Sequence, residues 1–443
     1  SLREAVRAAN TDTAVDACAP GAGADLIVLP AGLYTLAIPG AGEDDALTGD
    51  QEITGPLTLT RAGPARAPQD GADLDRVIDI RPGAGTVQIT GLTLQNGDAG
   101  LESGGVVRAV GSALALADSQ VRDGNADTGG GLFVSLGSLT MTGSRLTGNT
   151  ADIGGGLNLA YSTGLLVDSL VDGNLALDAE GDGGGEGGGI TSALGPLTVV
   201  NSTLSGNSAS DDGGGIYSAF DLALYNVTLA GNTADSDGDD AGGGGGVFFT
   251  TAYYAPAVFT ARNSLIAGNV DNGPTTRHPD CSGPLTGQGY NLLESTAGCA
   301  LAGDLTGNVT GISPNLGPLQ DNGGPTLTHA FLASSPAIDG GDPAGCRDQA
   351  GSALTTDQRG QARPVDGDAD GSPRCDLGAL EAGPGELPPT ATRTPTATPT
   401  ATGSPSPTRT ASPTRTATSV GAATATPTAT PSRTPTKPTV LPT

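Results

Sequence analysis

The sequence is short of large side chains. Its 443 residues include no Trp, six Phe, seven Tyr and a single Met, against 72 Gly. Large aromatic anchors therefore cannot dominate its core. Stacked small aliphatic side chains joined by backbone ladders fit this composition better, and solenoid proteins are built in that way.

Histidine is also scarce, and the cysteines have no metal-binding spacing. There are two His and five Cys, and no two Cys form a CxxC pair. These absences argue against a zinc site. Disulfides in an oxidising compartment explain the cysteines better. Pairing each cysteine with its neighbour in the sequence predicts the disulfides Cys281–Cys299 and Cys346–Cys375, although other connectivities remain open. Cys18 is then left without a partner in this sequence.

Acidic residues greatly outnumber basic ones, and the two are unevenly placed. No Asp or Glu follows Glu386, whereas five of the 20 basic residues do. The body, residues 1–386, therefore has 47 acidic and 15 basic residues and a formal charge of −32, and the tail that follows has a formal charge of +5. Such a body repels nucleic acids and anionic membranes. We therefore predict no nucleic-acid partner. No window is apolar enough to span a bilayer, so a membrane would be reached only through an anchor outside this sequence.

The first ten residues predict a short helix. Ser1 and Glu4 form a capping box, in which each side chain accepts a hydrogen bond from a backbone N–H at the helix start. Leu2, Val6 and Ala9 share one face. We expect residues 1–19 to cover the open end of a solenoid, where an exposed strand edge would invite aggregation.

From about residue 87 the chain repeats a unit of a Gly run, an apolar residue, an alternating strand and a turn ending in Asn. The turns end at Asn96, Asn125, Asn149, Asn174, Asn207, Asn232 and Asn269. The shorter Asn spacings, near 25 residues, suit one coil of a parallel β-helix, and the longer ones suit a coil with an inserted loop. Gly permits positive-φ corners, and stacked Asn side chains can form an amide ladder. Flexible Gly linkers are the alternative, but the apolar alternation between the runs is too regular for them.

The sequence thus predicts an all-β protein with a parallel β-helix over residues 20–310. Residues 311–387 are expected to form an irregular C-terminal cap. Residues 388–443 are a low-complexity Thr/Pro tract that cannot bury a core, and we expect a disordered, extended stalk.

Three groups of residues resemble known bacterial exported proteins. Residues 1–5, SLREA, look like the CSLREA motif without its leading Cys, which would be the partner of Cys18. Residues 314–341, 356–360 and 375–381 resemble the C-terminal region of choice-of-anchor Q proteins. The repeats are similar to the right-handed β-helices of pectate lyases and polymorphic outer-membrane proteins. The resemblance implies an exported cell-surface protein and leaves its activity undefined.

One loop has the pattern of a calcium site. Asp366, Asp368 and Asp370 alternate before a Gly, as the oxygen ligands of a Ca²⁺ loop do. The twelfth position, which is acidic in an EF-hand, is Leu377, and Asp376 comes one residue early. We predict that these four Asp residues bind Ca²⁺, with a solvated acidic turn as the alternative.

A second acidic pattern recurs between each Asn and the next Gly run. Its members are Asp98, Glu102, Asp127, Asp152, Asp178, Glu180, Asp182, Glu186, Asp211, Asp212, Asp235, Asp237, Asp239 and Asp240. Coils that stack in register would align these acids along one edge, about 4.8 Å apart. The edge would either bind cations or a basic or carbohydrate partner, or act as a solubility face.

The sequence favours a scaffold over an enzyme. A β-helix lyase uses an Arg or Lys as its base, on a strand beside the calcium ligands. The coils of this chain contain four candidates that do not share a repeat position: Arg108, Arg122, Arg145 and Arg262. His278 lies in a polar loop and His329 in the cap region, and no Ser-His-Asp or Cys-His pattern is evident. We therefore expect an extracellular display or adhesion scaffold that contacts surface glycans or other cell-envelope components. A polysaccharide lyase or glycoside hydrolase is the alternative.

Overall fold

The computed structural model describes residues 1–40, 45–64, 67–178, 183–239, 242–251, 256–275 and 277–384. The predicted stalk and the acids Glu180, Asp182 and Asp240 lie outside these ranges. Within them, no helix has the length and apolar character needed to cross a membrane.

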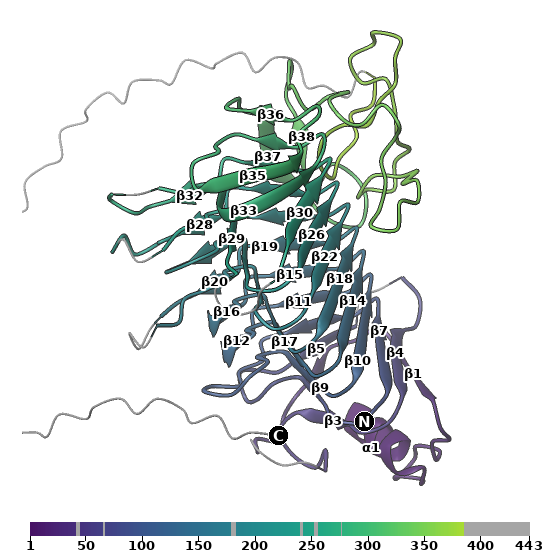
Figure 1. The fold of residues 1–443 in the computed structure, drawn as a ribbon. Coiled ribbons are helices and arrows are strands. Elements are labelled where there is room, and N and C mark those ends of the chain that lie inside the picture. Colours follow the sequence, from purple (N-terminus) through teal and green to yellow (C-terminus); the bar gives the residue numbers. More distant parts are fainter. Residues whose placement is uncertain are drawn as a thin grey trace, which may run out of the picture. The chain divides into compact units, whose positions relative to one another are not determined.

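The predicted N-terminal helix is present as α1 (Leu2–Thr11), at one end of the ladder of strands (Figure 1). The capping box between Ser1 and Glu4 forms in full. Leu2 and Val6 are buried as expected, together with Ala8, and α1 packs against the first strands of the body.

Parallel strands of the described residues stack into four sheets, which the coils visit in a fixed order, with sheet 4 confined to the coils from β12 to β32. Sheet 1 contains β3 (Gln51–Ile53), β6 (Ile78–Ile80), β9 (Val107–Val110), β13 (Leu132–Ser135), β17 (Leu157–Ala160), β21 (Ile190–Ser192), β25 (Ile216–Ser218), β29 (Val247–Phe249) and the start of β33 (Cys281–Gln288). Sheet 2 contains β1 (Asp25–Leu29), β4 (Leu57–Arg61), β7 (Thr86–Thr90), β10 (Ala113–Ala117), β14 (Ser138–Thr142), β18 (Thr163–Val167), β22 (Leu197–Val200), β26 (Leu222–Tyr225), β30 (Phe259–Arg262), the rest of β33, and β35 (Cys299–Asp304).

Two shorter sheets complete the turns of the middle coils. Sheet 3 contains β2 (Tyr34–Thr35), β5 (Pro68–Asp70), β8 (Thr93–Gln95), β11 (Gln120–Arg122), β15 (Arg145–Thr147), β19 (Leu170–Asp172), β23 (Thr203–Ser205), β27 (Thr228–Ala230), β31 (Leu265–Ala267), β34 (Leu292–Leu293) and β36 (Val309–Thr310). Sheet 4 contains β12 (Asn125–Thr128), β16 (Thr150–Ile153), β20 (Leu175–Ala176), β24 (Ser208–Ala209), β28 (Thr233–Ala234) and β32 (Val270–Asp271). The architecture is a right-handed parallel β-helix, as predicted.

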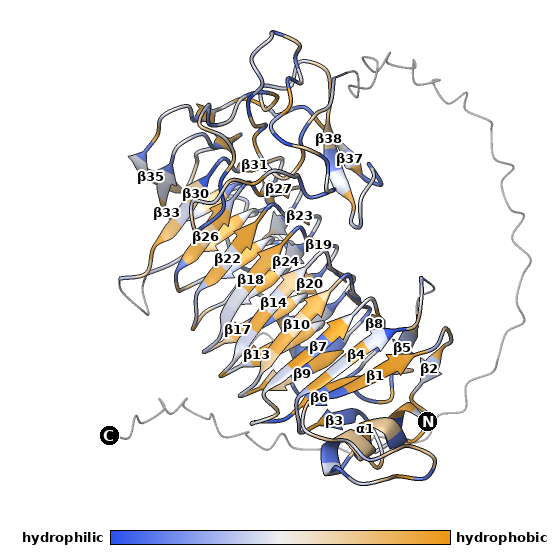
Figure 2. Ribbon diagram, turned by 90° about the vertical axis from the view of Figure 1, so that its right-hand side faces the viewer, coloured by the Kyte–Doolittle hydropathy of each residue, from blue (hydrophilic) through white to orange (hydrophobic). Residues whose placement is uncertain are grey.

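The core is a tube of aliphatic side chains held in register. Leu132 pairs with Leu157, 25 residues later, and Leu157 pairs with Ile190 after a coil lengthened by a loop. These side chains belong to one continuous buried cluster. Apolar residues accordingly recur along neighbouring strands such as β10, β14 and β18 (Figure 2). Because side chains alternate between the two faces of a strand, the residues between these positions point outward.

The predicted asparagine ladder forms over five coils. Its members are Asn149, Asn174, Asn207, Asn232 and Asn269, and each side-chain N–H donates to the Oδ1 of the next at 2.8–2.9 Å. Asn125 is not a member, because Gly124 occupies the ladder position in its coil and donates its N–H to Asn149.

The C-terminal segment packs along the side of the solenoid. Its hairpin pairs β37 (Leu316–Gln320) with β38 (Thr328–Phe331) in antiparallel fashion. Further on, Gln358 donates to Ser169 and accepts from Thr203, both in or next to sheet 3. A second buried cluster joins Leu377 and Leu380 to sheet 3 residues such as Leu265. The segment therefore runs back along sheet 3, whereas the sequence predicted only a cap.

Both predicted disulfides form. Cys281 and Cys299 join neighbouring coils, with their Cα atoms 5.3 Å apart. Cys346 and Cys375 join two parts of the C-terminal segment, with their Cα atoms 5.7 Å apart. Cys18 is unpaired in the described part of the chain.

Candidate functional site

The first outward-facing residues of the middle strands of sheet 1 align, although Asn158, Thr191 and Tyr217 are each less than 9% exposed. The outer column, as we call it, consists of Phe133, Asn158, Thr191, Tyr217 and Phe248, each paired in register with the next. The rings of Tyr217 and Phe248 are stacked, with centroids 5.5 Å apart and planes 8° from parallel. Three of the five positions are therefore aromatic in a chain that has few aromatic residues.

Asn158 is the unusual polar member of the outer column. It is only 8% exposed. Among the described residues its amide makes no hydrogen bond, whereas its column neighbour Thr191 donates to the carbonyl oxygen of Glu186 at 2.9 Å. The amide atoms of Asn158 are not among the fully buried side-chain atoms that lack a partner, so they keep contact with solvent. An amide offers both donors and an acceptor to water or to a ligand.

Acidic residues flank the outer column where sheet 4 turns into sheet 1. Glu186 and Asp212 occupy the same position in consecutive coils, since the N–H of Gly187 donates to the carbonyl of Asp212 at 2.9 Å. The Gly runs make this close turn possible, because a Cβ at Gly188 would lie 2.3 Å from the Ser208 carbonyl oxygen. We call Asp152, Asp178, Glu186, Asp211 and Asp212 the acidic edge.

The carboxyl groups of the acidic edge perturb one another. Burial raises the pKa of Glu186 to about 7, with further contributions from Asp211 and Asp152. Burial likewise raises the pKa of Asp212 to about 7, aided by Glu186 and Asp211. The pKa of Asp211 rises to about 6 through burial and repulsion from Asp178. The predicted alignment of acids is thus real for these described residues, and they are close enough to repel.

No basic residue of the middle coils offsets this charge. Residues 146–261 contain fourteen Asp or Glu and no Lys, Arg or His. Arg108 precedes Phe133 in register but is ion-paired with Asp79, with Nη1 and Oδ2 2.9 Å apart. His278 lies two coils beyond Asp212, and its Nδ1 is beside Gly243 of the coil between them.

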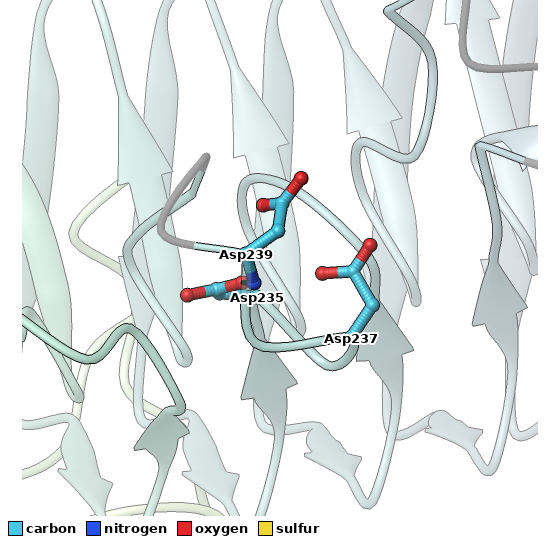
Figure 3. A group of neighbouring side chains, drawn as sticks. All are labelled: Asp235, Asp237 and Asp239. Atoms are coloured by element: carbon cyan, nitrogen blue, oxygen red, sulfur yellow. Dashed lines mark hydrogen bonds between the residues drawn. The ribbon is translucent and has the colours of Figure 1, made fainter.

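Among the described residues, two groups of three acids bring carboxylate oxygens within 4.8 Å of one another. Asp235, Asp237 and Asp239 lie around the loop that follows β28 (Figure 3). Within it, the buried Asp235 accepts a hydrogen bond from the Asp239 N–H. The other group joins Asp366 and Asp368 of the predicted calcium loop to Asp339.

The structure separates the four residues predicted to bind calcium. Asp366 and Asp368 lie together, whereas Asp370 is outside their group and accepts a hydrogen bond from the Ser372 N–H. Asp376 faces inward and accepts hydrogen bonds from the N–H groups of Asp339 and Ala382. Burial and the neighbouring Glu381 raise the pKa of Asp376 to about 8, so this carboxyl has a packing role. Sequence reasoning missed Asp339, because 27 residues separate it from Asp366.

The three remaining candidate arginines are engaged in ion pairs, as Arg108 is. Arg145 contacts Asp172, Arg262 contacts Asp342, and Arg122 contacts Asp123. His329 lies between Ser205 and the Gly317 carbonyl, and burial lowers the pKa of its imidazole. The outer column, with Asn158 in it, was not predicted from the sequence. The signal was present in the sequence. Each of the five residues is the second after a Gly run and directly follows the first buried apolar residue of its strand.

The fold places the chain in the class of right-handed parallel β-helix proteins. Among solved structures it is similar to the pectate lyase Pel9A, at 16% sequence identity, over 82% of this chain and 92% of that chain, with a TM-score of 0.45. A similarity at this level concerns the fold alone, and one fold hosts many activities. No protein-family model matches the chain, and no curated protein matches it. The terminal motifs therefore remain resemblances.

Proposed function

We propose that the protein is an extracellular β-helix scaffold that binds glycans along its outer column. The observation that carries this proposal is the in-register column of Phe133, Tyr217 and Phe248, with the polar side chains of Asn158 and Thr191 between Phe133 and Tyr217. Aromatic rings offer a broad apolar face to the C–H groups of a sugar ring. The Asn158 amide can both donate to and accept from sugar hydroxyl groups.

The spacing of the column suits an extended polymer. Successive coils lie about 4.8 Å apart, so Phe133 and Tyr217, three coils apart, are separated by roughly 14 Å. A linear glycan that follows the solenoid axis would meet both aromatic ends and the polar residues between them. A rigid sheet holds these contacts in place before binding, which lowers the entropy cost of association.

Location at the cell surface is part of the same proposal. Two disulfides support an oxidising compartment outside the cytoplasm. The Thr/Pro-rich tract at residues 388–443 has the composition of a stalk, which would hold the solenoid away from an anchor. The partners would then be surface glycans or other cell-envelope components.

We also propose that Asp339, Asp366 and Asp368 bind Ca²⁺. Their carboxylate oxygens lie within 4.8 Å of one another, and oxygen ligands suit this ion. Asp339 already accepts hydrogen bonds from the N–H groups of Gly367 and Asp368, which fixes the loop against the segment around Asp339. A bound Ca²⁺ would strengthen that same junction.

A carbohydrate-active enzyme is the second candidate. One observation favours it: Glu186 and Asp212 lie in consecutive coils beside the outer column, with His278 two coils beyond Asp212. Paired carboxyl groups, one of them protonated, are what glycoside hydrolysis requires. Release of reducing or unsaturated sugar ends would establish this candidate in place of the scaffold.

The test is a binding and cleavage assay with a panel of neutral, acidic and amino-sugar polysaccharides. We expect binding without release of sugar ends. Phe248→Ala and Asn158→Leu should each weaken binding by about tenfold, which is 1.4 kcal/mol. Tyr161→Ala is the matched control, because this exposed aromatic residue lies in the turn after β17, outside the column. Failure of every glycan to bind would refute the proposal.

A further inference from the structure

The coil formed by β3, β4 and β5 has amide side chains at two positions where later coils have aliphatic core residues. In sheet 1, Gln51 begins the register column that continues with Ile78 and Val107. In sheet 3, Gln69 takes the position that Leu94 has in the next coil. All three aliphatic residues belong to the buried core cluster. Both glutamines therefore lie on the inner side of the tube, near its N-terminal end.

The amides of these two glutamines lack partners. Gln51 is 4% exposed and Gln69 is 0% exposed. The Oε1 of Gln51 and both amide atoms of Gln69 are fully buried, and none has a hydrogen bond among the described residues. Buried polar groups are normally paired, because an unpaired group has lost its hydrogen bonds to water without replacement. Two such amides in one coil indicate an interior that is suited to receive hydroxyl groups.

A cavity of about 350 Å³, which we call the end cavity, lies beside Gln51. The start of α1, the segment from Leu33 to Ile38 around β2, and Gln51 itself form its wall. It thus lies at the end of the solenoid where α1 packs against β3 (Figure 1). Tyr34 of this wall is paired in register with Gln69, which lies one coil deeper. At ~30 Å³ for each water molecule, the end cavity has the volume of roughly ten waters, which is room for one small ring and not for a polymer.

The wall of the end cavity determines what kind of ligand fits. Leu2, Tyr34 and Leu36 offer apolar surface, and an aromatic ring packs well against the C–H groups of a sugar. The amide of Gln51 needs a donor for its oxygen and an acceptor for its nitrogen, and a hydroxyl group is both. The amide can turn about its terminal torsion, so either atom can face the cavity.

Charge narrows the class further. Arg3 lines the end cavity, but its guanidinium group already donates to three backbone carbonyl oxygens, those of Thr48, Gly49 and Asp50. The strongly negative body repels anions. A neutral ligand is therefore favoured over an acidic one.

We propose that the end cavity binds one neutral sugar ring, with hydroxyl groups hydrogen-bonded to the amide of Gln51. The Gln69 amide, one coil deeper, would be joined to the ligand through a bridging water. This site is separate from the outer column and does not depend on the proposed function.

The experiment titrates the full chain with glucose, galactose and mannose, and follows binding by calorimetry and by saturation-transfer NMR. We expect at least one of them to bind with a Kd of about 1 mM or tighter. The corresponding uronic acid, in which a carboxylate replaces the primary alcohol, should bind at least about tenfold more weakly. Phe248→Ala, in the outer column, should leave binding of the single sugar unchanged.

Gln51→Leu and Gln69→Leu connect binding to the two amides. Each puts an aliphatic side chain where the later coils have one, so both variants are expected to fold. Each should weaken sugar binding by at least about tenfold, while the melting temperature without sugar stays the same or rises, because a buried unpaired amide is removed. Gln88→Leu is the matched control, since Gln88 is exposed on β7, and it should bind the sugar as the wild type does.

The outcomes decide the proposal. It would be overturned if no single sugar bound, if the uronic acid bound more tightly than the neutral sugar, or if Gln51→Leu bound as the wild type does. A lower melting temperature of both glutamine variants without sugar would show that the amides stabilise the fold by themselves, and would overturn it too. Loss of binding in Phe248→Ala would move the sugar to the outer column, with the same consequence. None of these results bears on whether the outer column binds a polysaccharide, except the last, which would support it.

Discussion

The side chain of Asn174 donates a hydrogen bond of 2.9 Å to the Oδ1 of Asn207, which lies 33 residues later and one coil further along the solenoid. The backbone N–H of Asn174 donates to the same oxygen at 3.1 Å. Asn207 in turn donates to the Val171 carbonyl and to Asn232. One side chain thus satisfies polar groups of three coils inside a corner that excludes water.

We predict that Asn207→Ala lowers the free energy of unfolding by about 3 kcal/mol. The change leaves the buried backbone N–H of Asn174 without its partner and removes one hydrogen bond each from the Asn174 amide, the Val171 carbonyl and the Asn232 amide. A buried donor left without a partner costs about 1–3 kcal/mol, and each further bond lost costs about 1 kcal/mol. Chemical denaturation measures the loss. Asn125→Ala is the control, because Asn125 is exposed and outside the ladder, and it should change stability by less than about 0.5 kcal/mol. If the two variants lost the same free energy of unfolding, the asparagine ladder would not contribute more to stability than an exposed asparagine does.

The ladder shows what kind of information the sequence contained. Gly runs and Asn turns repeat within the chain, so the coil, its period and the buried corner could be predicted from local pattern. The contact between Thr203 and Gln358, which are 155 residues apart, does not arise from a repeated sequence pattern. The position of the C-terminal segment on sheet 3 could therefore not be predicted from the sequence. The same reason hid Asp339 from the predicted calcium loop, since proximity created by folding leaves no spacing to recognise.

We predict that the protein becomes less stable as pH rises from about 4 to about 7. Glu186 and Asp212 have pKa values raised to about 7 in the folded state, from 4.5 and 3.8. Between those limits the folded state binds more protons than the unfolded state, so the free energy of unfolding falls as pH rises. Stability from this source is complete below the unfolded pKa values and lost above the folded ones.

The double variant Glu186→Gln, Asp212→Asn tests the source of this pH dependence. Its melting temperature should fall less between these pH values than that of the wild type, and Asp118→Asn should behave like the wild type. A residual fall above neutral pH is expected in all three proteins, because the pKa of Asp376 is raised to about 8. A double variant whose pH profile matches the wild type would contradict the assignment.

We predict that Ca²⁺ raises the melting temperature and that a chelator reverses the effect. A ligand that binds only the folded state stabilises it by about 2.7 kcal/mol at one hundred times its Kd. Asp368→Asn should abolish the response, because its carboxylate lies in the group with Asp339 and Asp366. Asp370→Asn should retain it, since Asp370 lies outside that group. Loss of the response in both variants, or no response in the wild type, would remove the calcium proposal.

We predict that Arg363→Met loosens the C-terminal segment from sheet 3. The Arg363 side chain is fully buried, pairs with Glu381 at 3.2 Å, and donates to the Oδ1 of Asn201 at 2.9 Å. Removing one partner of a buried ion pair costs about 3–5 kcal/mol, because the remaining charge stays desolvated. Here the carboxyl groups of Glu381 and Asp376 would lie together without the guanidinium group that offsets their charge.

The C-terminal segment of the Arg363→Met variant should therefore become sensitive to proteases. It should also bind apolar dyes, because the cluster around Leu265 and Leu377 becomes exposed. Arg374→Met, which removes an exposed arginine from the same segment, should leave both measurements unchanged. If Arg363→Met resists proteolysis as well as this control does, the pair is not what holds the segment, and the apolar cluster alone must suffice.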